Sequence, residues 1–299
     1  MNRNLGKSDL WISEIGFGCM SLNESQKQAE SLLQQAFDAG INFFDTADLY
    51  DKGRNEEWVG KALQPFRKEV IIATKVGNQW REDGSTWDWN PSKDYILKAV
   101  EDSLRRLQTD YIDLYQLHGG TIDDPIDETI EAFEVLKQQG KIRWYGISSI
   151  RPNVIREYVK RSRIVSVMMQ YSLLDRRPEE EILSLLAEHQ ISVITRGGLA
   201  QGRLLGKKTG DYLQYTKTEV AKAAEAISNM ARDLNKSEIS VALAYILSQE
   251  AVTSAITGIR TTDQLYEVLE LLKNPLRLDG EQLQFLRASV RDYIYENHR

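Results

Sequence analysis

Short apolar runs typical of buried strands alternate with amphipathic segments along most of this chain. The alternation constrains the fold more than any other feature, because strands that alternate with helices form parallel sheets. Eight such runs occur, at residues 15–18, 41–44, 70–74, 111–117, 142–148, 165–169, 191–195 and 253–257. Eight units in 299 residues favour a closed (β/α)8 TIM barrel over an open doubly wound sheet, which usually has fewer strands.

Local signals mark the ends of two predicted helices. Asn90 is expected to cap the third helix, with Pro91 in its first turn. By the same reasoning Asp124 is expected to open the fourth helix before Pro125, and Gly140 to close it.

Two predicted elements lie outside the eightfold pattern. Residues 2–11 alternate in polarity around a turn at residues 6–9, which predicts a β-hairpin ahead of the barrel. Apolar residues at helical spacing predict a C-terminal helix, at Leu283, Leu286, Val290 and Ile294. No low-complexity linker interrupts the chain, so residues 1–299 are expected to form a single barrel domain.

Charge and composition argue against several classes of protein. The chain has 38 Lys and Arg against 44 Asp and Glu, a net charge of -6, with both signs interspersed, which argues against a nucleic-acid partner. The only cysteine cannot form an internal disulfide, and the three histidines are too far apart for a local metal motif: Cys19, then His118, His189 and His298. A reduced, metal-free protein is expected.

The first 20 residues place Lys7, Asp9 and Glu14 where a secretory signal would need an apolar core. No window of the sequence approaches a membrane span. We therefore expect a cytoplasmic protein that does not insert into membranes.

Titratable side chains follow three successive predicted strands. Asp45 ends the second, Lys75 the third and His118 the fourth. The carboxyl ends of barrel strands converge on one face, so these side chains should lie close together, with Tyr50 just beyond them. A single such residue would more often be structural, as Asp45 would be in a turn. Three on adjacent strands indicate an active site.

These motifs resemble those of the aldo-keto reductases, a family that reduces aldehydes and ketones with NADPH. The likeness is carried by residues 44–50 (Phe-Asp-Thr-Ala-Asp-Leu-Tyr), by Ala73-Thr74-Lys75 and by Leu117-His118. The likeness extends from Gly16 to about Leu272. The potassium-channel β-subunits share the same resemblance. It implies an NADP(H)-dependent oxidoreductase acting on a small aldehyde or ketone; a non-catalytic or weakly catalytic NADP(H)-binding regulatory subunit is the alternative.

The resemblance implies a catalytic role for each of the four residues. Tyr50 would donate the proton, Lys75 would favour the phenolate left behind, and Asp45 would hold Lys75. His118 would hydrogen-bond the carbonyl oxygen, although a core histidine bonded to backbone is the alternative. A lyase that uses Lys75 as a Schiff-base amine would need a depressed lysine pKa, which a neighbouring Asp45 opposes.

The resemblance also implies a set of cofactor-binding residues. Ser148 and Gln170 would bind the nicotinamide carboxamide, the loop after residue 197 the pyrophosphate, and Arg260 a 2′-phosphate, which favours NADP(H). The full set is Met20, Asp45, Ser148, Gln170, Arg196, Leu199, Gln201, Gly202, Arg203, Lys207, Gly258, Arg260 and Gln264.

Three positions depart from the family pattern. Ser149 stands where relatives often have asparagine, and Val268 where many have an asparagine for the adenine. Arg196 replaces an aromatic residue that stacks on the nicotinamide; it can either stack as a planar cation or turn away to pair with an acid.

Two further patterns concern a group of tryptophans, which has two possible roles, and two runs of charged residues. Three tryptophans after the third strand are candidates either for an apolar substrate wall or for loop packing, namely Trp80, Trp87 and Trp89. The charge runs at residues 176–181 and 123–124 are interpreted as helix starts and solvated faces.

Overall fold

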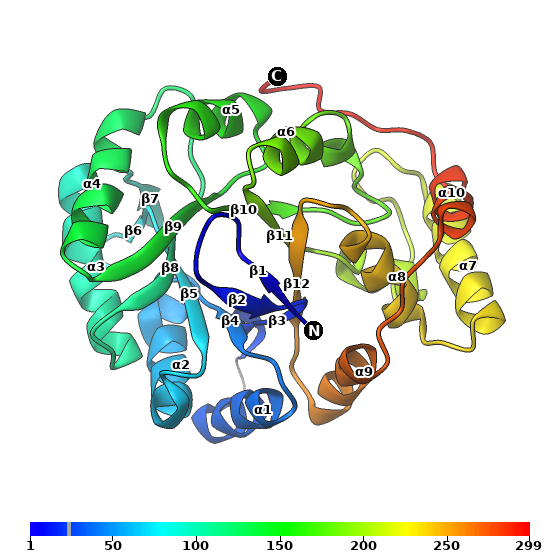
Figure 1. Ribbon diagram of the computed structural model, residues 1–299, viewed down its shortest axis with the longest axis horizontal. Coiled ribbons are helices and arrows are strands. Elements are labelled where there is room, and N and C mark those ends of the chain that lie inside the picture. The colour runs from blue at the N-terminus through cyan, green and yellow to red at the C-terminus, as the bar shows by residue number, and fades with distance from the viewer. Residues whose placement is uncertain (23–24) are drawn as a thin grey trace.

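A computed structural model describes residues 1–22 and 25–299 of the chain. Eight parallel strands close into a barrel in the order β10-β11-β12-β3-β4-β5-β8-β9, which confirms the predicted (β/α)8 fold. Figure 1 shows the barrel end-on inside its ring of helices. The strands are β3 (Ile15–Gly18), β4 (Phe43–Asp45), β5 (Ile71–Val76), β8 (Ile112–Leu117), β9 (Ile142–Ser148), β10 (Ser166–Gln170), β11 (Ser192–Arg196) and β12 (Val252–Gly258).

Ten α-helices surround the barrel in the described part of the chain (Figure 1). They are α1 (Gln26–Asp38), α2 (Arg54–Leu63), α3 (Lys93–Leu107), α4 (Ile126–Gln138), α5 (Pro152–Arg161), α6 (Ile182–Glu188), α7 (Lys217–Asp233), α8 (Glu238–Leu247), α9 (Thr262–Lys273) and α10 (Gly280–Ala288). None of these described helices is both long and apolar enough to cross a membrane.

Several strands begin and end slightly later than the apolar runs suggest. The second run starts at Ile41, but β4 starts at Phe43, because the Ile41 N–H bonds the Ala36 carbonyl at the end of α1. At their carboxyl ends β5, β10 and β11 extend to include Lys75, Gln170 and Arg196. The polar residues that end these strands are therefore fixed by the sheet ladder.

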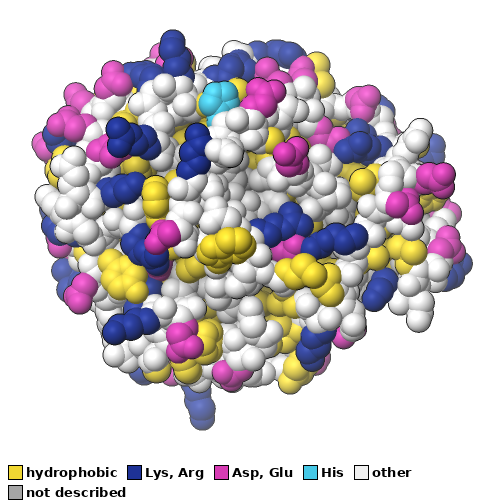
Figure 2. All heavy atoms as spheres, viewed as in Figure 1, with side chains coloured by type: hydrophobic (Ala, Val, Ile, Leu, Met, Phe, Trp, Pro, Cys, Tyr) yellow, Lys and Arg dark blue, Asp and Glu magenta, His cyan; other side chains and the backbone are white. Residues whose placement is uncertain are grey.

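A hairpin closes the N-terminal end of the barrel, as predicted. β1 (Asn2–Asn4) pairs antiparallel with β2 (Trp11–Ser13), and Leu5 and Leu10 between them are fully buried. They pack with Phe43 and Ile71, the first residues of β4 and β5. Figure 1 shows the hairpin lying across the centre of the ring. Figure 2, from the same side, shows acidic and basic side chains interspersed on this face.

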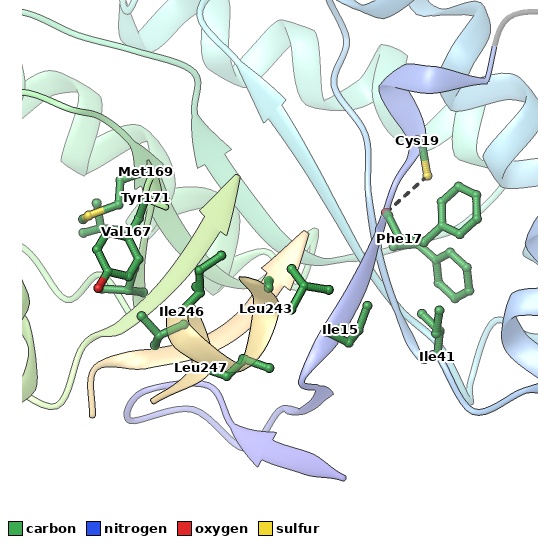
Figure 3. Packing of buried hydrophobic residues seen from close by; sticks show 14 of the residues in the cluster. Ile15, Phe17, Cys19, Ile41, Val167, Met169, Tyr171, Leu243, Ile246 and Leu247 are labelled. Atoms are coloured by element: carbon green, nitrogen blue, oxygen red, sulfur yellow. Dashed lines mark hydrogen bonds between the residues drawn. The ribbon is translucent and has the colours of Figure 1, made fainter. Parts of the chain in front are cut away.

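The main core lies between the barrel and its helices (Figure 3). Phe17 of β3 and Phe44 of β4 contact each other there, with ring centroids 6.0 Å apart. Cys19 is buried beside them, and its thiol donates to the Phe17 carbonyl at 3.8 Å. Burial raises the pKa of this thiol well above its ordinary value, so Cys19 behaves as an apolar core residue.

The predicted N-caps of α3 and α4 are wrong, whereas Gly140 does close α4, with a φ of 73°. Ser92, not Asn90, caps α3: its hydroxyl accepts from the Tyr95 N–H, while Asn90 accepts from the N–H of Ser92 itself. Asp124 does not cap α4, because its carboxylate is engaged by the backbone and hydroxyl of Thr121. In both places the predicted cap, Asn90 or Asp124, instead hydrogen-bonds a residue two or three positions away in the chain.

Two other predictions need correction. The C-terminal helix α10 ends at Ala288, so Val290 and Ile294 lie beyond it, the first buried and the second exposed. Arg176 and Arg177 are not on a solvated face, since their side chains are only 12% and 13% exposed and pair with Glu179 and Asp175.

An antiparallel hairpin that the sequence analysis did not predict follows β5. It consists of β6 (Asn78–Trp80) and β7 (Trp87–Trp89), with Trp80 opposite Trp87. The residues between these strands, 81–86, are polar apart from Gly84, so the segment lacks the apolar alternation that predicts strands.

Gly60 of α2 allows a close helix contact that we expect an alanine to disrupt. A Cβ on Gly60 would lie 2.6 Å from the backbone of Leu107 at the end of α3. Gly60→Ala should therefore lower the free energy of unfolding by about 1–3 kcal/mol, despite the better helix propensity of alanine.

Urea unfolding followed by circular dichroism measures this effect. Gly280→Ala is the matched control, because a Cβ on this glycine at the start of α10 meets no atom within 4 Å. Equal midpoints for the two variants would refute the steric argument.

Candidate active site

The structure brings Asp45, Tyr50, Lys75 and His118 together at the carboxyl end of the barrel. Asp45 ends β4, Lys75 lies in β5, and His118 directly follows β8; these three strands are neighbours in the barrel. Tyr50 begins a 3-10 helix, η2 (Tyr50–Gly53), in the loop after β4. The barrel strands thus position Asp45, Lys75 and His118, and the loop after β4 positions Tyr50.

A buried ion pair forms the base of the site. The Lys75 Nζ lies 2.7 Å from Asp45 Oδ2 and donates a second bond of 2.7 Å to the Thr46 carbonyl. The two side chains are only 1% and 6% exposed. The other Asp45 oxygen accepts from the Gln116 amide at 3.4 Å. Both charged groups thus have partners on more than one side.

The electrostatics keep Lys75 protonated. Burial works against its charge, but the adjacent Asp45 and Tyr50 outweigh burial and raise the lysine pKa. Burial also raises the pKa of Asp45, and the Lys75 ammonium opposes that rise. A Schiff-base lysine needs a depressed pKa, so the lyase hypothesis is not supported.

Tyr50 and His118 lie above this pair. Their rings make an edge-to-face contact with centroids 5.8 Å apart, and the Lys75 Nζ is 5.1 Å from the centre of the Tyr50 ring. Burial raises the pKa of Tyr50, although the Lys75 charge acts in the opposite direction. The phenol is therefore protonated at neutral pH.

His118 is neutral. Burial, reinforced by the charges of Lys75 and Arg196, lowers its pKa to about 3. Its buried Nδ1 has no hydrogen-bond partner among the residues that the structure describes. A core histidine would have this nitrogen bonded to backbone, so the ring remains available to a ligand.

The loop that carries Tyr50 is conformationally strained. Asp51, Lys52 and Gly53 follow it with φ angles of 47°, 54° and 87°. Left-handed conformations of residues other than glycine are costly, and such strain persists only where surrounding contacts enforce it. This turn leads directly into α2, whose first residue follows Gly53.

Several buried polar side chains near this loop form hydrogen bonds that the sequence did not predict. The Thr46 hydroxyl donates to Asn55 at 2.7 Å, and Asn55 donates to the Cys19 carbonyl. Thr74 donates to Glu56, which also pairs with Arg106. Polar residues flanking an apolar strand were the available signal, but their partners lie far away in sequence.

The next three strands present the candidate nicotinamide contacts. Ser148, Gln170 and Arg196 end β9, β10 and β11. Arg196 donates to Gln170 Oε1 at 3.2 Å, while the Gln170 amide donates to Asp175 at 2.8 Å. Arg196 forms no ion pair within the described structure, so it has not turned away to an acid as one hypothesis held.

The loop after β11 forms a left-handed cradle. The 3-10 helix η5 (Ala200–Leu205) contains Gln201 and Gly202 at φ 59° and 86°, and Leu199 precedes it. The Lys207 N–H bonds the Gly202 carbonyl, which closes the turn. The buried Nε of Arg203 lacks a partner among the described residues. An unpartnered guanidinium nitrogen in a loop of this shape suits an anion.

The remaining predicted cofactor residues lie near the end of β12. A Cβ on Gly258 would lie 2.6 Å from the Ser21 hydroxyl, so glycine permits a close approach there. Arg260 and Ser21 line a small cavity of about 10 Å³. The Gln264 side chain accepts from the Arg260 N–H, and Met20, which precedes Ser21, is 67% exposed.

Val268 lies on the buried face of α9, where its apolar side chain packs into the core.

Trp80, Trp87 and Trp89 lie in three different environments. Trp89 packs against Gly77 and Gly119 and donates to Asp124, so it supports the loops beside His118. Trp80 donates to the Leu49 carbonyl, and Trp87 is 44% exposed.

An acid, an ammonium, a phenol and a neutral imidazole thus meet at the carboxyl end of the barrel, beside a loop with two left-handed residues. The comparisons give the family. A model of the Aldo/keto reductase family matches residues 14–290, and the chain belongs to that family.

Individual relatives match along nearly the whole chain. It is 55% identical to the uncharacterized oxidoreductase YqkF of Bacillus subtilis, over 99% of each chain. The holo form of aldo-keto reductase AKR11C1 from Bacillus halodurans superposes with a TM-score of 0.94 at 50% identity, covering 100% of this chain and 99% of that one. A probable voltage-gated potassium channel subunit beta of Oryza sativa is 28% identical over 96% of each chain.

We expect Asp45→Asn to destabilise the protein strongly, because it leaves the buried Lys75 charge without its counter-ion. Breaking a buried pair by removing one partner costs about 3–5 kcal/mol of unfolding free energy.

Asp88→Asn is the matched control, since Asp88 forms a pair of similar length with Arg81 on the surface. That variant should unfold at the same urea concentration as the unmodified protein. Similar midpoints for Asp45→Asn and Asp88→Asn would contradict the importance of the buried pair.

Proposed function

We propose that this protein reduces an aldehyde or ketone with NADPH, reversibly, with Tyr50 as the general acid. The observation that carries the proposal is the position of the Lys75 ammonium, held by Asp45 and Thr46 and 5.1 Å from the centre of the Tyr50 ring. This cation stabilises the phenolate that remains after proton donation.

The residues present fit a dinucleotide. Arg203, with its unpartnered Nε, and Lys207 supply positive charge for the pyrophosphate, and the left-handed turn at Gly202 lets backbone approach it. Ser148 and Gln170 would bind the carboxamide. When bound, reduced nicotinamide supplies the hydride.

Each catalytic side chain then has a defined task. Neutral His118 hydrogen-bonds the carbonyl oxygen and orients the substrate, since its imidazole is free of other partners. Tyr50 gives its proton to the same oxygen as negative charge develops there. Asp45 keeps Lys75 charged and oriented, and does not meet the substrate.

Arg260 supports NADPH over NADH. Its guanidinium is exposed beside the cavity formed with Ser21, and it forms no ion pair among the described residues. A 2′-phosphate carries the charge that such a group binds best. Gly258 lies against Ser21, Gln264 holds the Arg260 N–H, and Met20 is an exposed neighbour of Ser21 in the chain; we assign all three to the cofactor site as well.

The alternative is a non-catalytic or weakly catalytic NADP(H)-binding regulatory subunit, as the likeness to a channel β-subunit suggests. The complete set of four catalytic side chains favours turnover. Steady oxidation of NADPH by a panel of small aldehydes, followed by absorbance with NADH in parallel, separates the two functions. Tight NADPH binding without any turnover would favour the regulatory subunit.

Tyr50→Phe should lower kcat for carbonyl reduction by at least about 100-fold, because a general acid contributes this much and phenylalanine has no proton to donate. NADPH affinity, measured by fluorescence titration, should stay unchanged. Tyr266→Phe, which removes an exposed hydroxyl on α9, is the control and should have full activity. Activity of Tyr50→Phe close to that of the control would refute the assignment.

The rate of reduction should be flat between about pH 6 and pH 9. Burial raises the pKa of Tyr50 above its ordinary value of 10.0, so the protonated acid is lost only as pH rises beyond this range. His118, with a pKa of about 3, is already neutral throughout it. The pH profile of kcat/KM tests both points. An inflection near pH 6.5 that disappears in His118→Asn would show that His118 titrates, against this expectation.

A further inference from the structure

A cleft of about 390 Å³ lies outside the barrel, behind the loop that carries Tyr50. It is bounded by that loop, by the β6–β7 hairpin and by α3. Its lining includes Asp48, Lys52, Trp80, Tyr95 and Lys98, and none of the four catalytic side chains. The cleft is therefore separate from the catalytic face, although residues 48 and 52 flank Tyr50 in sequence. Its volume is within the range of small-molecule sites.

A carboxyl group with one unpartnered oxygen lies in the wall of the cleft. Asp48 is only 8% exposed, and its Oδ1 makes no hydrogen bond within residues 1–22 and 25–299. Burial, with the nearby Glu56, raises its pKa well above the ordinary value. Buried polar atoms are normally satisfied, so an exception on a residue that lines a cleft suits a hydrogen-bonding ligand.

The cleft also holds two ammonium groups that form no ion pair within residues 1–22 and 25–299. Three of its six charged side chains pair with residues outside it, as Arg81–Asp88, Asp102–Arg105 and Arg106–Glu56. Lys52 and Lys98 form no ion pair in the described part of the chain. The unpaired groups are thus two ammonium ions and one buried carboxyl. Two ammonium groups on opposite walls suit a doubly charged anion such as a phosphate monoester.

The other walls favour a ligand with hydroxyl groups and a ring. Trp80 is half-buried, with the Lys52 Nζ 5.3 Å from its ring centre, and Tyr95 faces the cleft from α3. The amide side chains of Asn78 and Gln79 add hydrogen-bonding groups. Aromatic faces with amides and a carboxyl bind the apolar faces and hydroxyls of cyclic polyols.

We propose that this cleft binds a small phosphorylated cyclic polyol, with the phosphate between Lys52 and Lys98 and a hydroxyl on Asp48. The site goes beyond carbonyl reduction and does not depend on it. Lys52 already reaches across to the hairpin, where a Cβ on Gly84 would lie 2.9 Å from its Nζ. A ligand held by residues 48 and 52 contacts the chain on both sides of Tyr50. It would therefore brace the strained segment 51–53 that follows Tyr50.

Calorimetric titration of the NADPH-saturated protein tests the site. The probe is 1,5-anhydroglucitol 6-phosphate, which has no carbonyl group to reduce, and saturating NADPH occupies the proposed cofactor phosphate sites. The unphosphorylated anhydroglucitol and inorganic phosphate are separate arms, which distinguish the polyol from the anion. Hydrogen exchange of segment 48–53 is measured in parallel and should slow when the probe binds.

Substitutions of the two cleft lysines test whether the probe binds in the cleft. Lys52→Gln and Lys98→Gln should each weaken the probe at least about tenfold, since each removes a charge-assisted contact. Lys160→Gln is the matched control, an exposed lysine on α5 that is not part of the cleft. Circular dichroism shows whether each variant is folded. Because no readout requires turnover, an inactive enzyme would still report on the cleft.

Saturable binding of the phosphorylated probe, weakened in both cleft variants and not in Lys160→Gln, supports the proposal. Three results would overturn it: no saturable binding, binding that the cleft variants leave unchanged, or inorganic phosphate binding as tightly as the phosphorylated polyol.

Discussion

The buried contact between Lys75 and Asp45 is the interaction on which the rest of the site depends. Barrel register creates it: Asp45 is paired with Ala73 of β5, two residues before Lys75, so both side chains project to the same side of the sheet. Lys75 is in turn opposite Gln116 of β8, whose amide reaches the other Asp45 oxygen. Removing charges from water is costly, and this closed set of partners offsets the cost.

That fixed ammonium determines the protonation of its neighbours. It favours the phenolate of Tyr50, although burial still holds the phenol protonated at neutral pH. It also disfavours an imidazolium at His118, with Arg196 adding a second positive charge. One lysine thus lowers the cost of losing a proton from the phenol and adds to the burial that keeps the histidine neutral, a division of roles that suits the proposed carbonyl reduction.

The barrel and the four convergent side chains could be predicted because each apolar run stops at a polar residue, and parallel strands bring such stops together. Gln116 was missed because its contact with Asp45 follows from register between strands, which no local pattern encodes. The cap of α3 was misplaced because Asn90 and Ser92 are both good caps. The β6–β7 hairpin was hidden by its polar turn, so the cleft beside it had no sequence signal.

The contacts of Gln170 constrain how the proposed cofactor can enter. Its amide nitrogen donates to Asp175 and to the Tyr212 hydroxyl, while its oxygen accepts from Arg196. The Gln170 oxygen has one further lone pair for a carboxamide N–H, whereas any other bond to Gln170 has to replace one of these contacts, which offsets part of the binding energy. The bond to Arg196 is the easiest to exchange, because that guanidinium is exposed and can return to water. Arg196 therefore acts first as a competitor for Gln170, and only after displacement can its plane stack on a ring.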